Sequence, residues 1–271
     1  NVPRTVDGAT DYLCGVEGAM TNDRDDAATL AAIGVSISLA ASVAHEALGH
    51  GISCIAEHGH ITLLTFLVFR CLDGGVWTDG GGPIAVLIAG ALSLILLHKL
   101  PPRQQLARLW LRNFATMSLL WSCGQDLSES FDGSDDWGHV AHDLSWPTWW
   151  HQALGIVSLA GYTFVMRWVV KLAKSIVGGA PGRLLIPYSS AMLSAVALGS
   201  LWHGARLASA LDGFLSFGVA PMGYLLIARR LSVAKAHHPP YLPHTRCFIA
   251  LVALLCLAFA LTVARGIGPL A

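Results

Sequence analysis

The sequence predicts an all-α protein, a polytopic transmembrane helical bundle of six or seven spans. Three observations predict this class. Of the 271 residues, 54% are hydrophobic and only 13% are charged, whereas about a quarter of the residues of an ordinary soluble domain are charged. The mean hydropathy is +0.56. Long apolar runs, such as residues 30–56, have the length that a helix needs to cross a bilayer.

Polar segments divide the chain into an arm and a series of apolar runs. Residues 1–27 are polar and acidic and predict an N-terminal arm, and residues 28–271 predict one integral membrane domain. The third run is the weakest, because Arg112 and Asn113 interrupt it. The expected spans are 29–56, 82–100, 107–125, 151–176, 184–206, 212–229 and 247–265.

The segment 61–69 lies between the first two expected spans and is too short to cross a bilayer as a helix. It is rich in residues that favour strands, so we expect a short strand or a re-entrant segment. Cys54 and Cys71 flank it, and a disulfide between them is one of the pairings that the spacing permits.

Charge excludes one class of partner and orients the chain. The 17 basic residues equal the 17 acidic ones, and nucleic-acid binding requires a basic surplus. With a cytoplasmic N-terminus and seven spans, only Arg70, Arg206 and Arg265 lie outside, which fits the positive-inside rule. We therefore expect an integral membrane protein, in contact with lipids, in a bacterial inner membrane.

The first expected span contains two histidines and a glutamate, His45, Glu46 and His50. Ionisable residues are costly inside a membrane and usually mark a functional site. Histidines five residues apart lie about 140° apart around a regular helix, so both reach one metal ion only if the helix widens into a π-bulge. In a regular helix, Glu46 and His50 would instead form an i, i+4 pair.

In the expected orientation, His45 and His50 fall in the outer half of the first span. More polar residues are expected on the same outer side. The segment 126–150 contains no Lys or Arg and is rich in Asp and His. These residues either belong to a metal site or reflect the acidic composition that exported loops commonly have. His203, inside the fifth expected span, is a candidate metal or pigment ligand or a hydrogen-bonded core histidine.

Three short motifs in order resemble the site-2-protease family of intramembrane zinc metalloproteases, in particular its branch of small bacterial membrane proteins. The first is His-Glu-x-x-Gly-His-Gly at 45–51, one residue longer between the histidines than the family pattern. The second is Gly-Gly-Gly-Pro at 80–83, expected to open the second span. The third is Gly-Ser-Asp-Asp-Trp at 133–137. The resemblance covers roughly residues 30–165.

The resemblance implies a zinc ion held by His45, His50 and an aspartate, with Glu46 as the general base that accepts a proton from the attacking water. Asp136 matches the Asp-Trp motif best. A His/His/Asp set suits iron as well as zinc. The alternative ligands are Asp132, His139, His142, His203 and Asp212.

Two functions remain open. The first is hydrolysis of peptide bonds in or beside membrane segments of other proteins. The second is a catalytically inactive pseudoprotease, an accessory or structural subunit of a larger membrane complex. The second is favoured by the longer histidine spacing and by the absence of the asparagine that follows the family's Gly-Pro motif.

Overall fold

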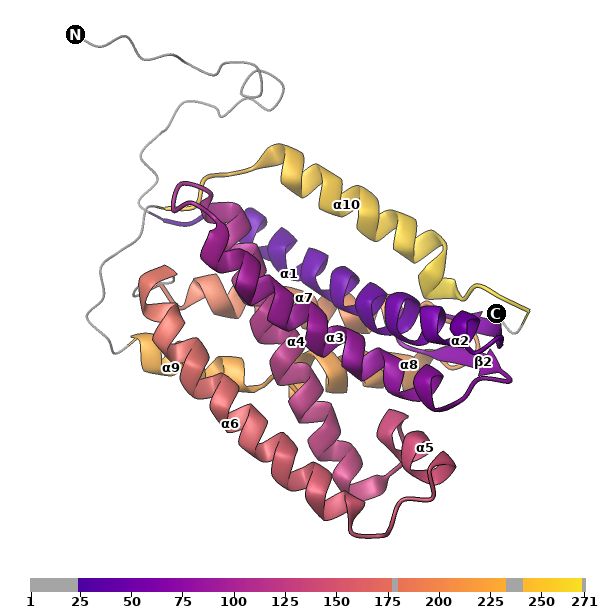
Figure 1. Ribbon diagram of the computed structural model, residues 1–271. Coiled ribbons are helices and arrows are strands. Elements are labelled where there is room, and N and C mark those ends of the chain that lie inside the picture. Colours follow the sequence, from indigo (N-terminus) through magenta and orange to yellow (C-terminus); the bar gives the residue numbers. More distant parts are fainter. Residues whose placement is uncertain (1–23, 177–179, 233–240, 270–271) are drawn as a thin grey trace, which may run out of the picture.

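The computed structural model describes residues 24–176, 180–232 and 241–269, and these residues are mostly helical (Figure 1). The all-α class is confirmed for them, with one small two-stranded sheet. The predicted arm, 1–27, lies almost wholly outside the described residues. The elements are α1 (Ala27–Ser42), the π-helix η1 (Val43–Gly51), α2 (Ile52–Ala56), β1 (His60–Leu64), β2 (Phe69–Leu72), α3 (Val76–Lys99), α4 (Gln105–Asp132), α5 (Asp136–Asp143), α6 (Trp150–Ile176), α7 (Gly182–Gly199), α8 (Arg206–Phe214), the π-helix η2 (Leu215–Val219), α9 (Gly223–Ser232), α10 (Arg246–Leu261) and the 3₁₀-helix η3 (Val263–Arg265).

Helices occupy all seven predicted positions, but within the described residues five stretches are long and apolar enough to cross a bilayer. The two others are α4 and α7. Both are interior helices that carry hydrogen-bonding side chains. Ser190 of α7 donates to the carbonyl of Ala31 (2.9 Å), and the buried Arg112 of α4 donates to the carbonyl of Val169 (2.8 Å). Polar side chains lower the mean hydropathy of a helix. Because these side chains are hydrogen-bonded to neighbouring helices, the helix can still lie in the protein interior.

Two helices extend further than expected. α3 begins at Val76, so the Gly-Gly-Gly-Pro motif at 80–83 lies inside the helix and does not open it. α4 continues to Asp132, so the first part of the predicted 126–150 loop is helical and α5 forms within the remainder. The extension of α4 places acidic residues on a rigid element.

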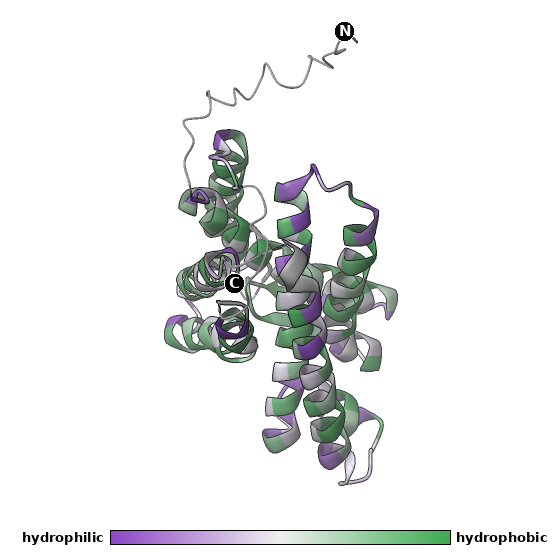
Figure 2. Ribbon diagram, turned by 90° about the vertical axis from the view of Figure 1, so that its left-hand side faces the viewer, coloured by the Kyte–Doolittle hydropathy of each residue, from purple (hydrophilic) through white to green (hydrophobic). Residues whose placement is uncertain are grey.

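α1 lies in the interior and packs mainly against α7 and α10, while α3 packs against η1 and α4 (Figure 1). The α1–α7 crossing is close, because a Cβ added at Gly34 would overlap the carbonyl oxygen of Pro187. Asp26 caps α1 by accepting a hydrogen bond from the backbone of Thr29 (2.7 Å). Hydrophobic residues cover most of the length of the helices, with hydrophilic stretches towards their ends (Figure 2).

The sheet lies beyond the first long helix. β1 pairs antiparallel with β2, and its backbone also exchanges hydrogen bonds between Leu64 and Ile267 (both 2.9 Å). A disulfide joins Cys54 to Cys71 and ties α2 to β2. The strand predicted within 61–69 is therefore confirmed as β1, and the disulfide is the pairing that the spacing permitted.

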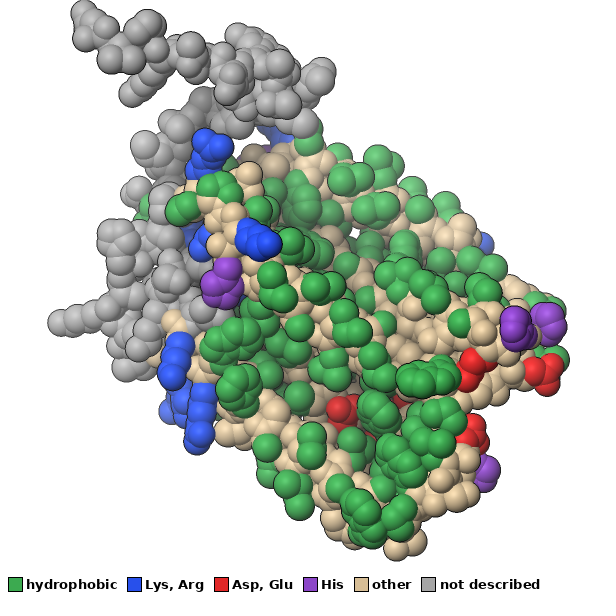
Figure 3. All heavy atoms as spheres, viewed as in Figure 1, with side chains coloured by type: hydrophobic (Ala, Val, Ile, Leu, Met, Phe, Trp, Pro, Cys, Tyr) green, Lys and Arg blue, Asp and Glu red, His purple; other side chains and the backbone are tan. Residues whose placement is uncertain are grey.

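Charge separates along the helices (Figure 3). Basic side chains gather where α3 and α9 end and where α4 and α10 begin, which we call the basic end. Most Asp, Glu and His side chains lie at the opposite end, near α2, the sheet and α5, which we call the acidic end.

Candidate metal centre

The histidine segment of the first long helix is a π-helix. Hydrogen bonds in a π-helix run from residue i to residue i+5, so side chains five apart project from the same side. The rings of His45 and His50 accordingly meet edge to face with centroids 4.7 Å apart. The predicted widening of the helix is confirmed, and the regular i, i+4 pairing of Glu46 with His50 is not the geometry of this segment.

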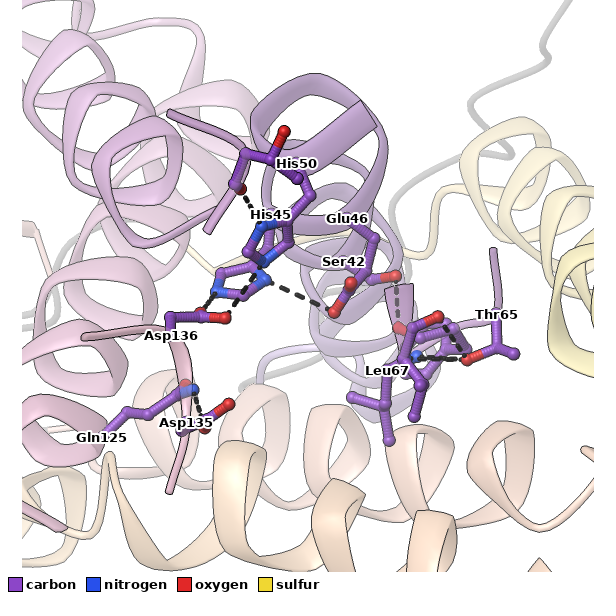
Figure 4. Close-up of polar contacts among 12 residues, drawn as sticks. Ser42, His45, Glu46, His50, Thr65, Leu67, Gln125, Asp135 and Asp136 are labelled. Atoms are coloured by element: carbon purple, nitrogen blue, oxygen red, sulfur yellow. Dashed lines mark hydrogen bonds and ion pairs between the residues drawn. The ribbon is translucent and has the colours of Figure 1, made fainter. Parts of the chain in front are cut away.

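Asp136, the first residue of α5, faces both histidines (Figure 4). Its Oδ2 lies 3.3 Å from Nε2 of His45, and its Oδ1 lies 3.4 Å from Nε2 of His50. Ligands 2.0–2.1 Å from a tetrahedral zinc ion are separated by about 3.3–3.4 Å. Both distances between Asp136 and the histidines match this separation.

Neighbouring groups fix the orientation of both imidazoles. Nδ1 of His50 lies 2.6 Å from the carbonyl oxygen of Thr78, so this nitrogen carries the proton and Nε2 offers a lone pair. Phe69 stacks on His50 with centroids 5.5 Å apart, and Trp121 lies against His45 at 5.1 Å. α3, α4 and β2 thus each contribute a contact that holds a ring in place.

The close approach of α3 depends on glycine. A Cβ at Gly82 would overlap Nε2 of His50 and lie 2.7 Å from Cε1 of His45. A Cβ at Gly49 would lie 2.6 Å from the carbonyl oxygen of Gly81. The space between the imidazoles and α3 exists only because these positions have no side chain, which gives Gly49 and, within the 80–83 motif, Gly82 a physical role.

The residues present fit a metal ion. His45, Glu46 and His50 are all buried. Among the residues that the structure describes, they form one of two groups of side chains that are placed to hold a metal ion. Oδ2 of Asp136 and Nδ1 of His45 have ion-pair contacts at 3.3 Å but make no hydrogen bond of good geometry. Burial by itself would raise the pKa of Asp136, but the contacts with His45 and His50 outweigh it and hold the pKa of this carboxyl well below its usual range.

Glu46 lies beside the three side chains. Its Oε1 is 3.3 Å from Nδ1 of His45, and one of its carboxylate oxygens lies within 4.8 Å of a ring nitrogen of His50. In this position the carboxylate can orient His45, or it can accept a proton from a water molecule at the centre. The two roles predict different behaviour of a Glu46→Gln variant.

A cavity of about 620 Å³ opens onto this centre at the acidic end. Its walls come from η1, the sheet, α3, α4, α5, α8 and η2, so a bound molecule would lie against the imidazoles and Asp136. Leu67, Phe69 and Trp121 provide apolar walls, while Thr62 and Arg70 add polar groups. Carboxylates outside the cluster, those of Asp79, Asp135 and Asp212, complete a lining that is both apolar and acidic.

The structure separates the alternative ligands into two sets. His139 and Asp212 line the cavity without taking part in the His45–His50–Asp136 cluster. Asp132 is exposed and accepts a hydrogen bond from the backbone of Ser134 (3.2 Å). The remaining two histidines face solvent, paired with acidic or basic neighbours: His142 with Asp143, and His203 with Arg206.

Several residues of the centre had no clear sequence signal. Thr78 and Trp121 act through one backbone or ring contact each, and no spacing rule indicates such contacts. Glu129 was visible only as one acid among many in the 126–150 segment. With Asp135 and Asp136 it forms the second group of side chains that are placed to hold a metal ion.

Comparison of the chain with protein-family models, with curated proteins and with solved structures finds no match.

Proposed function

We propose that this protein is an intramembrane zinc metalloprotease that hydrolyses peptide bonds in or next to membrane segments of other proteins. The observation that carries the proposal is the convergence of His45, His50 and Asp136 with ligand spacing, beside Glu46 and at the base of a cavity. Two imidazoles, one carboxylate and an accessible fourth side are the arrangement of a hydrolytic zinc site.

In this proposal, Nε2 of each histidine and the carboxylate of Asp136 hold the metal. Bound zinc supplies a Lewis acid that acidifies water and polarises a carbonyl group. Glu46 accepts the proton of the attacking water and donates it to the leaving amine. The hydrogen bond with Thr78 holds His50 in the tautomer that offers its Nε2.

The surroundings of the site supply a reason for a membrane-segment substrate. Five stretches of the described chain are able to cross a bilayer, and the cavity lies near the end of three of these helices. We propose that the basic end is cytoplasmic, as the positive-inside rule predicts, and that the cavity opens towards the outer face. The disulfides do not distinguish the two sides of the membrane, because Cys54 at the acidic end and Cys247 near the basic end are both disulfide-bonded. The proposed orientation therefore depends on charge alone.

The test is proteolysis in a reconstituted bilayer. Purified protein, loaded with zinc, is incubated with a membrane-protein extract, and new N-termini are identified by mass spectrometry. The proposal predicts a set of new termini that the Glu46→Gln variant produces at least 100-fold more slowly, although this variant retains its zinc. Asp132→Asn, which changes an exposed carboxylate at the same end, serves as the matched control and retains activity.

Equal cleavage by wild type and Glu46→Gln would overturn the proposal. Zinc binding without any new termini would favour the inactive accessory subunit. A third result has its own meaning: if Glu46→Gln loses zinc and activity together, Glu46 orients His45 and another group is the base.

A further inference from the structure

Glu129, in the last turns of α4, is a buried acid with one free oxygen. Its side chain belongs to a residue that is only 2% exposed. Oε2 accepts a hydrogen bond from the backbone of Trp137 (2.8 Å), while Oε1 has no hydrogen-bond partner. A buried carboxylate oxygen without a partner costs free energy unless a proton or a cation compensates it.

Two further carboxylates surround the same point. Single oxygens of Glu129, Asp135 and Asp136 all lie within 4.8 Å of one another. Asp135 is held in place by Gln125, whose amide donates to its Oδ2 (2.8 Å) (Figure 4). The group joins the end of α4 to the start of α5.

A neighbouring cavity of about 380 Å³, which shares Asp135 and Asp212 with the first cavity, is lined by Glu129 and Asp135 of this group. Four carboxylates line it, and none of its lining residues, all within the described chain, is Lys or Arg. The walls are therefore strongly negative, and a cation is the ligand that such a cavity favours. The carboxylates are Glu129, Asp132, Asp135 and Asp212.

We propose that Glu129, Asp135 and Asp136 form a second cation site, which takes a hard divalent cation of the Mg²⁺, Mn²⁺ or Ca²⁺ class. All its donors are carboxylate oxygens, the ligands that these ions prefer, whereas the first centre offers two imidazoles, which suit zinc. Asp136 belongs to both centres, because its oxygens face His45 and His50 as well. A carboxylate has about four lone-pair positions and bridges two ions without losing either contact.

The second ion would fix the position of Asp136. It would neutralise the charge between Asp135 and Asp136, which are adjacent in sequence and would otherwise repel each other. It would also tie the first turn of α5 to α4, so that Asp136 stays in place opposite the histidines. The carboxylate shared between two ions makes the second site a positioning device for the first.

The test uses full-length protein in detergent, stripped with a chelator and reloaded with zinc, then titrated with Mn²⁺ followed by electron paramagnetic resonance. We expect one saturable Mn²⁺ site in addition to one zinc. Glu129→Gln should weaken Mn²⁺ binding at least 100-fold and change zinc content less than threefold. His50→Ala should show the reverse, with zinc lost and Mn²⁺ binding kept. Asp132→Asn, from the same cavity, should keep both ions.

Mn²⁺ binding that is absent from wild type, or unchanged in Glu129→Gln, would overturn the proposal. Because Glu129 is buried, its variant also needs a check of folding by circular dichroism. If it fails to fold, Asp135→Asn decides the question, since Asp135 is exposed and its replacement leaves the core unchanged. Loss of Mn²⁺ in that variant supports the second site, and retention contradicts it. Zinc binding and proteolysis are measured separately, so their failure is distinguishable from this one.

Discussion

The first and last long helices of this protein are both strongly apolar, yet they have opposite environments. In the helix that runs from α1 through α2, 61% of the most apolar 18-residue stretch is buried inside the protein. In the span that contains α10, the buried share of the corresponding stretch is 11%. The first helix carries His45, Glu46 and His50, and α10 carries no acidic residue or histidine. Figure 1 shows α10 lying along the outside of α1.

The difference shows that two helices of similar apolar composition can have different surroundings, one enclosed by protein and one exposed on the outside. α10 exposes its leucines on the outside of the protein. Such a surface suits a bilayer, because apolar side chains have no cost in lipid. The first helix is enclosed by protein on several sides, and this enclosure lets it hold polar side chains and a π-helical stretch. Hydropathy predicts that both are membrane helices, but only the polar residues identify the one that carries the site.

The largest expected difference concerns stability. Ile37→Ala in α1 removes a side chain that is 1% exposed and should lower the free energy of unfolding by about 2–5 kcal/mol. Leu254→Ala in α10, where the side chain is 66% exposed, should change it by less than about 1 kcal/mol. Thermal unfolding in one detergent compares them directly. Equal losses would mean that α10 is packed by protein and not by lipid.

The second prediction concerns the helix that covers the imidazoles. Gly82→Ala would push a methyl group against Nε2 of His50, so zinc affinity should fall at least tenfold, about 1.4 kcal/mol. Gly80→Ala is the matched control, because its Cβ would meet Val140 at an ordinary 3.5 Å. Competition with a zinc chelator measures both. Affinities that are the same in the two variants would place the ion away from the imidazoles.

The third prediction is smaller and concerns Glu57, which holds the start of α3. Its carboxylate accepts hydrogen bonds from the backbones of Gly75, Trp77 and Thr78 and from the Thr78 hydroxyl. This is the stabilising position for an anion at a helix N-terminus. Glu57→Gln should therefore cost about 1 kcal/mol at neutral pH.

The pH dependence of the same contact has a definite sign. Burial alone would raise the pKa of Glu57, but these hydrogen bonds outweigh it and lower the pKa below its ordinary 4.5. The stabilisation is complete above that value and is lost as the pH falls through the lowered pKa. Melting curves from pH 7 to pH 3 should fall more steeply for wild type than for Glu57→Gln. Parallel curves would contradict this assignment.

The fold class and the centre of the site were predictable from local patterns. Apolar runs indicated helices at all seven positions. The five-residue histidine spacing required a π-helix only if both histidines bind one metal ion, and it left a regular helix open as the alternative. Asp136 was the first choice among several aspartates on the strength of the Asp-Trp motif alone. The structure places it opposite both imidazoles.

What the sequence could not indicate depends on contacts between distant segments. Arg112 looked like an interruption of a span, but its guanidinium bonds to the carbonyl of Val169 inside the protein. The role of Gly82 exists only where α3 meets η1. Glu129 was one acid in an acidic segment, and its burial follows from the unexpected length of α4. Such tertiary contacts have no fixed spacing along the chain.

The most direct test of the central claim is the zinc content of the purified protein, measured by elemental mass spectrometry for wild type, His50→Ala and His142→Ala. His142 is the control, since its side chain is 88% exposed and belongs to neither centre. We predict about one zinc per chain in wild type and in His142→Ala, and none in His50→Ala. Wild-type protein without stoichiometric metal, or equal zinc in all three, would contradict a zinc centre built on His45, His50 and Asp136.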